Sequence, residues 1–301
     1  MLRGTARIGI AVRRWGAGVA ALLLTAVAGM AAPVRIVGSD LPGLEFSKAL
    51  YGFAGRQGIQ LALAFDGTKA GVTELQAGRA SAALLVAAPD LRRPSAEHDV
   101  LRLGSFTVFV WAGPECPLET ISFEQLVTIF GARESAAVLR WRDLGRTGDG
   151  SEAAITALVP SVGVGLTTEF FRHAVLGDGA LRKTVERVES TAEIRRELAR
   201  APAGVALAGV APEAGRGVRV LPVSAGKGLP AVAPTPEAVR AGRYALQVPL
   251  ELVVRRGAAA EVRTMLRFVC SEEAAALLER AEVVPVPADE RRRNEAALAD
   301  R

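Results

Sequence analysis

The sequence predicts an α/β protein in which strands and helices alternate along the chain. Its 301 residues are enough for one or two domains with a sizeable core, and 50% of them are hydrophobic. Short apolar runs of strand type are followed by stretches with helical periodicity, several of which end at glycine. This alternation is typical of parallel sheets covered by helices, so we expect parallel α/β organisation.

The first third of the chain shows this pattern most clearly. Pro42 suits a first helical turn, and Gly58 and Gly78 suit helix exits. The elements expected there, in order, are strand 33–38, helix 42–57, strand 59–65, a helix opened by the turn 66–71, and strand 82–87.

The rest of the chain continues the alternation. Ser122 with Gln125 and Ser190 with Glu193 form capping-box patterns that mark two helix starts. Pro249 predicts an edge or a bulge in its strand. The expected elements are strand 101–111, a helix ending at Gly131, short strands 138–141 and 155–159, a helix after 168, helix 191–200, strands 203–209, 218–223 and 246–254, helices 258–269 and 272–281, and an apolar end at 283–286.

Residues 1–31 differ from the rest and have the pattern of a secretory signal peptide. They hold four arginines and no acidic residue, then an uncharged run of 16 residues, Trp15–Met30, and small residues after it. The run is shorter than the roughly 20 residues that span a membrane. We therefore expect cleavage after Ala31 and a periplasmic protein; a retained anchor is the alternative.

The basic charge of the chain comes largely from this segment. The whole chain has 37 Lys and Arg against 32 Asp and Glu, a formal net charge of +5, which invites a nucleic-acid partner. Without the four arginines, 33 basic and 32 acidic side chains remain. The cluster Arg291–Arg293 has no interleaved aromatic residues. We therefore expect no nucleic-acid partner.

Sequence motifs for catalysis and metal binding are absent. The chain has two histidines, His98 and His173, both expected at the surface, and no CxxC, GxSxG, HExxH or Walker motif. We therefore predict no enzyme activity, no metal and no other cofactor. Cys116 and Cys270 could pair in an oxidising compartment, but their spacing alone does not decide this.

Five segments follow one another in an order that carries a family resemblance. They are residues 37–40 (VGSD), 66–82 (DGTKAGV then GRASA), 121–145 (ISFEQL, IFG and WRDLG), 165–171 (GLTTEFF) and 267–274 (RFVCSEEA). They resemble the phosphate-binding-protein branch of the type II periplasmic substrate-binding proteins, the soluble receptors of ABC importers. The resemblance implies a two-lobed α/β fold with a ligand cleft between the lobes. Lobe one would comprise residues 33–107 and 248–301, and lobe two residues 108–247.

The expected ligand site lies at turns where a strand leads into a helix. Backbone N–H groups at helix N-termini hold an oxyanion well, because unpaired donors and the helix dipole coincide there. For each turn alone, ordinary N-capping is the alternative; the resemblance favours ligand contacts. The candidates are Ser39, Asp40, Gly67, Thr68, Lys69, Gly165, Thr167 and Thr168, with Ser81 where the family has an Asp.

The sequence departs from the family pattern at several of these places. Leu166 stands where the family has Gly, and Leu41 stands where the family often has Thr. The family often has an Arg in the segment that corresponds to residues 159–163, where it pairs with the oxyanion, but this segment contains no Arg here. The resemblance implies a monomeric, exported solute-binding protein for phosphate or another small oxyanion, serving an ABC permease. The alternative is a divergent periplasmic sensory or protein-interaction module on the same fold.

Overall fold

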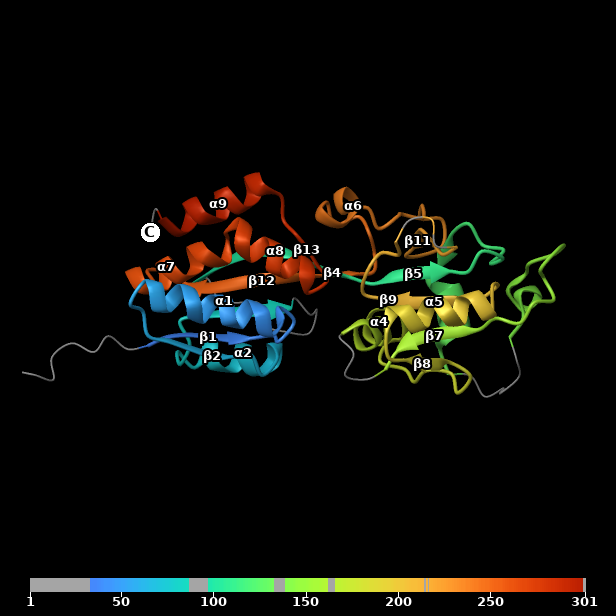
Figure 1. Cartoon of the computed structure of the whole chain (residues 1–301), viewed down its shortest axis with the longest axis horizontal. Helices are drawn as coiled ribbons and strands as arrows, with labels where there is room; N and C mark the ends of the chain where they lie inside the picture. Colours follow the sequence, from blue (N-terminus) through green and yellow to red (C-terminus); the bar gives the residue numbers. More distant parts are fainter. Residues whose placement is uncertain are drawn as a thin grey trace, which may run out of the picture. The chain divides into compact units, whose positions relative to one another are not determined.

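The structure is a computed structural model that describes residues 33–86, 97–132, 139–161, 166–213, 215 and 217–299. The predicted signal peptide lies outside these residues. Two main sheets, of six and five strands, are surrounded by helices (Figure 1). The predicted α/β fold class is confirmed. None of the described helices is long and apolar enough to cross a membrane.

The six-stranded sheet has the order β13-β4-β12-β3-β1-β2. Its strands are β1 (Val34–Gly38), β2 (Leu61–Ala64), β3 (Ala82–Val86), β4 (His98–Thr107), β12 (Gln247–Arg255) and β13 (Val283–Pro285). β1 is parallel to both β2 and β3, whereas β12 and β13 run antiparallel to their neighbours. The carboxyl ends of β1, β2 and β3 therefore lie at one edge of the sheet.

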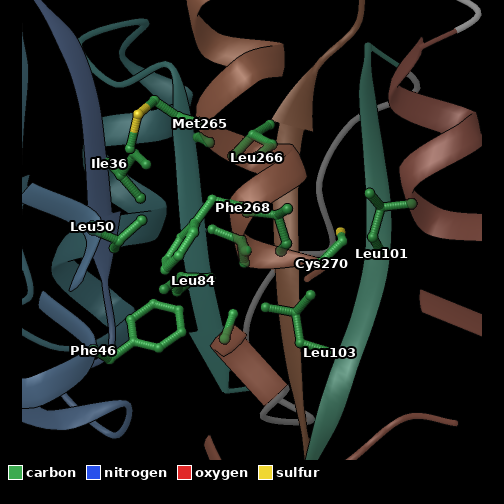
Figure 2. Packing of buried hydrophobic residues seen from close by; sticks show 14 of the residues in the cluster. Ile36, Phe46, Leu50, Leu84, Leu101, Leu103, Met265, Leu266, Phe268 and Cys270 are labelled. Carbon is green, nitrogen blue, oxygen red and sulfur yellow. The ribbon is translucent and has the colours of Figure 1, made fainter. Parts of the chain in front are cut away.

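Five helices accompany this sheet: α1 (Gly43–Arg56), α2 (Thr68–Gln76), α7 (Ala260–Val269), α8 (Glu272–Arg280) and α9 (Ala288–Ala299). Figure 2 shows Phe46 and Leu50 of α1 facing Met265 and Phe268 of α7 over the strands. Each such side chain contributes about 1.5–3 kcal/mol when fully buried. The helix buries Phe46, Leu50 and Ala54, whereas Leu44, which the apolar spacing also assigns to the buried face, is 67% exposed.

The five-stranded sheet has the order β10-β5-β9-β7-β8. The strands are β5 (Phe109–Ala112), β7 (Ala157–Pro160), β8 (Glu186–Val188), β9 (Val205–Ala208) and β10 (Arg219–Val220); β6 (Ile121–Ser122) and β11 (Val223–Ser224) form a separate pair. The helices are α3 (Phe123–Phe130), α4 (Thr167–Leu176), α5 (Thr191–Arg200), α6 (Pro236–Arg240) and the 3-10 turn Trp141–Leu144. β7 is parallel to β8 and β9, so these strands also end at one edge.

The segment WRDLG has a structural role in this half of the protein. Trp141 is fully buried, and its indole N–H donates a hydrogen bond to the Ala203 carbonyl at 3.0 Å. The Asp143 carboxylate accepts from the Arg140 N–H at 2.8 Å, and Gly145 ends the turn with a positive φ. This part of the family resemblance therefore reflects a core anchor and a closed turn.

Four sequence predictions of local structure are wrong. The expected strand 218–223 is divided between β10 of the five-stranded sheet and β11, which pairs with β6. The expected strand 101–111 is two strands, β4 and β5, which belong to different sheets, and Val108 between them donates its N–H to the Leu246 carbonyl. Trp141 begins a 3-10 turn instead of ending a strand, and Val138 lies outside the described residues. His98 is 9% exposed at the start of β4 rather than on the surface.

Three elements have no signal in the apolar pattern. β8 is three residues long with two charged side chains, α6 directly follows the loop rich in Pro and Gly, and α9 is largely charged. Pro249 lies in β12 one residue before the pairing with β3 begins at Leu250. The pairing of β12 with β4 shifts register between Leu250 and Glu251, close to this proline. The missing N–H of proline is tolerated there.

The two sheets are formed by different stretches of the chain. The six-stranded sheet uses residues 34–107 and 247–285, and the five-stranded sheet uses residues 109–220. By contacts, Val34–Arg301 is one compact unit. The lobe boundaries expected from the resemblance therefore stay a prediction.

Cys116 and Cys270 are both buried free thiols, and they belong to different core clusters. Burial raises the pKa of both thiols, that of Cys270 to about 12. We expect neither to react with a thiol reagent at pH 8 in the native protein, since only the thiolate is nucleophilic. Two thiols per chain should react after unfolding without reductant. Rapid labelling of the native protein, or no labelling after unfolding, would contradict this.

Candidate functional site

Two of the three predicted turns meet at the carboxyl edge of the six-stranded sheet. The Gly67 N–H donates to the Gly38 carbonyl at 2.8 Å, and the Val86 N–H donates to Thr68 Oγ1 at 3.1 Å. Thr68, the first residue of α2, is thereby tied to the ends of β1 and β3. Ser39 follows β1 directly and lies at the same edge.

The side chains at this edge differ in how exposed they are and in whether they already make hydrogen bonds. Ser39 is 3% exposed, and its Oγ accepts a hydrogen bond from the Leu41 N–H at 3.2 Å. Its hydroxyl proton has no hydrogen-bond partner among the described residues. Asp40 and Lys69 are exposed. The structure brings together Ser39, Gly67 and Thr68, with Asp40 and Lys69 beside them.

The third turn lies at the carboxyl edge of the five-stranded sheet. Thr168 Oγ1 donates to the Pro160 carbonyl at 2.7 Å, which ties the start of α4 to the end of β7. Thr167 is 2% exposed, but its hydroxyl makes no hydrogen bond within the described residues. Gly209 follows β9, and a β-carbon placed on it would lie 3.1 Å from Thr167 Oγ1. Gly165 lies outside the described residues.

The helices that begin at these turns have no side-chain N-cap. α3, α5, α6 and α8 each have a Ser or Thr whose hydroxyl accepts from a first-turn N–H; these residues are Ser122, Ser190, Thr235 and Ser271. α1, α2 and α4 have none, and neither does α7. Thr68 and Thr167 occupy the first helical positions, so the N-capping alternative is wrong for them. The Gly43 N–H at the start of α1 donates to the Asp40 carbonyl at 2.9 Å. The other first-turn N–H groups of α1, α2 and α4 make no hydrogen bond within the described residues, so they and the helix dipole are left for another acceptor.

Ser81 does not join these residues. Its Oγ accepts from the Arg35 N–H at 3.3 Å, immediately before β3 begins. Gly38 is paired with Leu84, so Ser81 lies level with the start of β1, whereas Ser39 lies beyond its end. The resemblance assigns Ser81 to the ligand site because the residues around it match the family. Ser81 precedes β3, however, so the direction of that strand puts it toward the opposite edge of the sheet.

Apolar side chains lie beside both edges. Leu41 and Val86, at the edge of the six-stranded sheet, pack against the hydrophobic clusters of both sheets. Leu166, directly before α4, packs against the cluster of the five-stranded sheet. The two leucines that depart from the family pattern are therefore packing residues, and the edge that carries Ser39 and Thr68 contacts the core of the other sheet.

One charged residue at the α4 turn was missed by the sequence analysis. Glu282 follows α8 and has a φ of 65°, and a β-carbon on Gly209 would overlap its carboxylate oxygen Oε2. Burial raises the pKa of this carboxyl. A glutamate directly after a helix end, where glycine is usual, is a weak signal of a functional position. The described part of the chain contains no group of three or more His, Cys, Asp or Glu that could hold a metal ion.

No family model and no curated protein matches this chain, but solved structures do. A possible phosphate binding protein from Planctomyces limnophilus is 20% identical, with a TM-score of 0.74 over 90% of this chain and 99% of that one. PstS from Borrelia burgdorferi is 15% identical, with a TM-score of 0.69 over 85% and 100%. An ABC-type phosphate transport receptor from Vibrio cholerae is 16% identical, with a TM-score of 0.62 over 83% and 98%.

The chain has the fold of these phosphate-binding proteins. The resemblance stated from five short segments is confirmed as a similarity of fold, and the two-lobed α/β architecture with it. In this fold, the ends of the parallel strands carry Ser39, Thr68, Thr167 and Thr168. Gly209 and Glu282 lie beside the start of α4.

Proposed function

We propose that this chain is an exported solute-binding protein that binds phosphate or another small oxyanion for an ABC permease. The observation that carries the proposal is the start of α4, where no side chain caps the helix and the hydroxyl of Thr167, a residue that is 2% exposed, makes no hydrogen bond within the described residues. Unpaired N–H groups and a hydroxyl donor at a helix N-terminus suit an anion. The fold similarity to proteins described as phosphate-binding or phosphate transport receptors supports the same class of ligand.

Local donors have to supply the binding free energy. After loss of residues 1–31 the chain is nearly neutral, so no strong overall positive field attracts an anion. A hydrogen bond to a charged group contributes about 1.5–3 kcal/mol. Several donors from Ser39, Thr68 and the α1, α2 and α4 starts would together be sufficient for a stable complex.

Export and transport complete the proposal. The pattern of residues 1–31 supports export of the mature protein to the periplasm, where a monomeric receptor would deliver its ligand to a permease. The similar solved structures include transport receptors, which supports binding without catalysis.

Calorimetric titration of the mature protein, residues 32–301, with phosphate, sulfate and molybdate tests the proposal. We expect saturable one-to-one binding of at least one of these anions. No heat with any of them, from a protein that unfolds cooperatively, would reject oxyanion binding. It would favour the sensory or protein-interaction alternative on the same fold.

A further inference from the structure

The backbone at Glu282 is unusual for its residue type. α8 ends at Arg280, and Glu282 takes the left-handed conformation while its N–H donates to the Glu279 carbonyl at 3.1 Å. Glycine is usual at such helix exits, and Gly177 occupies that position after α4 with a φ of 56°. The left-handed conformation is costly for a residue with a β-carbon. The backbone therefore gives no reason for a glutamate here, and its side chain needs another explanation.

The Glu282 carboxylate lies at the start of α4. A β-carbon on Gly209 would overlap Glu282 Oε2 and would also lie 3.1 Å from Thr167 Oγ1. The carboxylate and the free hydroxyl thus lie close to one point at the end of β9. Glu282 directly precedes β13 of the six-stranded sheet, so one sheet places a negative charge at the proposed anion site of the other.

This charge is not compensated by the described residues. The Glu282 carboxylate makes no hydrogen bond or ion pair with any of them, and burial alone raises its pKa. Neither Glu279 on α8 nor Glu169 on α4 contributes to that shift, and Glu169 is paired with Arg172 at 2.9 Å. Residues 162–165, which precede α4 and lie outside the described residues, include no ionisable side chain.

We propose that Glu282 is an internal competitor of the ligand: its ionised carboxylate opposes an anion at the start of α4, and protonation of Glu282 relieves this. The inference concerns regulation of the proposed oxyanion site and rests on that function. Two negative charges about 4 Å apart near a protein surface repel strongly enough to weaken binding about tenfold or more.

The direction of the pH dependence follows from proton linkage. A bound anion raises the pKa of Glu282 above its already raised value in the free protein, so binding takes up a proton. Affinity is therefore highest below the pKa of the free protein. It falls as the pH rises through that value to the higher pKa of the complex. Export into a more acidic medium would strengthen binding.

The test measures sulfate binding at about pH 4 and pH 8, because sulfate stays fully ionised over this range. Wild type should bind about tenfold more weakly at pH 8 than at pH 4. Glu282→Gln should bind equally at both, with the wild-type affinity of pH 4. Gly209→Ala, whose methyl group displaces the carboxylate, should also bind more tightly than wild type at pH 8. Glu279→Gln removes a nearby exposed charge and should behave as wild type.

Each other outcome has a defined meaning. If Glu282→Gln binds sulfate at pH 8 no more tightly than wild type does, the proposal that Glu282 competes with the ligand is overturned. Phosphate binding by wild type without sulfate binding by any variant also overturns it and leaves the proposed function intact. No binding of phosphate or sulfate by any variant at either pH rejects both.

Stability without any anion gives an independent readout. The pKa of Glu282 is raised in the folded protein, so its buried charge destabilises the fold only when the carboxyl is ionised. This destabilisation is absent below the pKa of the unfolded chain and is complete once the pH has risen through the pKa of the folded protein. Glu282→Gln should therefore unfold at a higher temperature than wild type at pH 8 and at the same temperature at pH 4. Equal unfolding temperatures at pH 8 would show that the buried contact is not formed and would overturn the proposal.

Discussion

Replacing Thr167 with valine is expected to weaken oxyanion binding at least tenfold while changing the free energy of unfolding by less than about 0.5 kcal/mol. A hydrogen bond to a charged group contributes about 1.5–3 kcal/mol, which is a factor of ten or more in affinity. The hydroxyl of Thr167 has no partner within the described fold, so its replacement by a methyl group leaves no other polar group unsatisfied. Calorimetric titration with the anion that wild type binds, and urea unfolding, measure the two effects.

Thr168→Val is the matched control for this variant. The Thr168 hydroxyl donates to the Pro160 carbonyl at 2.7 Å, and both groups are buried. Its loss leaves a carbonyl without that donor, which costs about 1–3 kcal/mol of stability. The two neighbours should thus separate binding from stability. Wild-type affinity in Thr167→Val would exclude Thr167 as a ligand contact and would weaken the case for the α4 site.

Replacing Gly38 with alanine is expected to destabilise the protein by about 4 kcal/mol or more. Gly38 has a φ of 124°, which side chains with a β-carbon rarely adopt. The added β-carbon would overlap the Leu84 carbonyl oxygen of the paired strand β3. Relief requires movement of β1 away from β3, and losses of this size mark such backbone clashes. Because Ser39 follows directly, anion binding should be lost as well.

Gly43→Ala serves as the control for this substitution. Gly43 also has a positive φ, 78°, but an added β-carbon would meet no atom within 4 Å. Only the backbone strain remains, about 1–2 kcal/mol. Urea unfolding of both variants gives the comparison. If Gly38→Ala were no more destabilising than Gly43→Ala, the close pairing of β1 and β3 would be incorrect.

Local sequence patterns predicted most of the elements that are long or strongly apolar. Helix 42–57 and strand 33–38 lie within a few residues of α1 and β1, because Pro42 and Gly58 mark the ends of the helix and the strand is a short β-type run. β8 was not predicted, because it is short and charged and depends on its pairing with β7. The run 101–111 has no turn residue at positions 107–109, where the chain passes from one sheet to the other, so its division between two sheets could not be read from hydrophobicity.

The candidate site was predicted in part. Ser39, Thr68 and Thr167 follow strands and begin turns or helices, which local turn chemistry makes recognisable. Ser81 was misplaced, because similarity of neighbouring residues does not indicate which edge of a sheet a side chain joins. Glu282 was missed, because its position is defined by a contact with Gly209 from a distant part of the chain.

The sequence by itself determined the alternation of strands and helices, the turn residues at the strand ends and the near-neutral charge of the mature chain, because these depend on local periodicity and composition. Only the tertiary structure decided which hydroxyl groups are available to a ligand. Thr168 is bound to Pro160, whereas Thr167 has no partner and faces Gly209 beside the Glu282 carboxylate. The reason is physical: hydrogen bonds and steric contacts between distant segments are set by how the sheets and helices pack, and no local pattern records them.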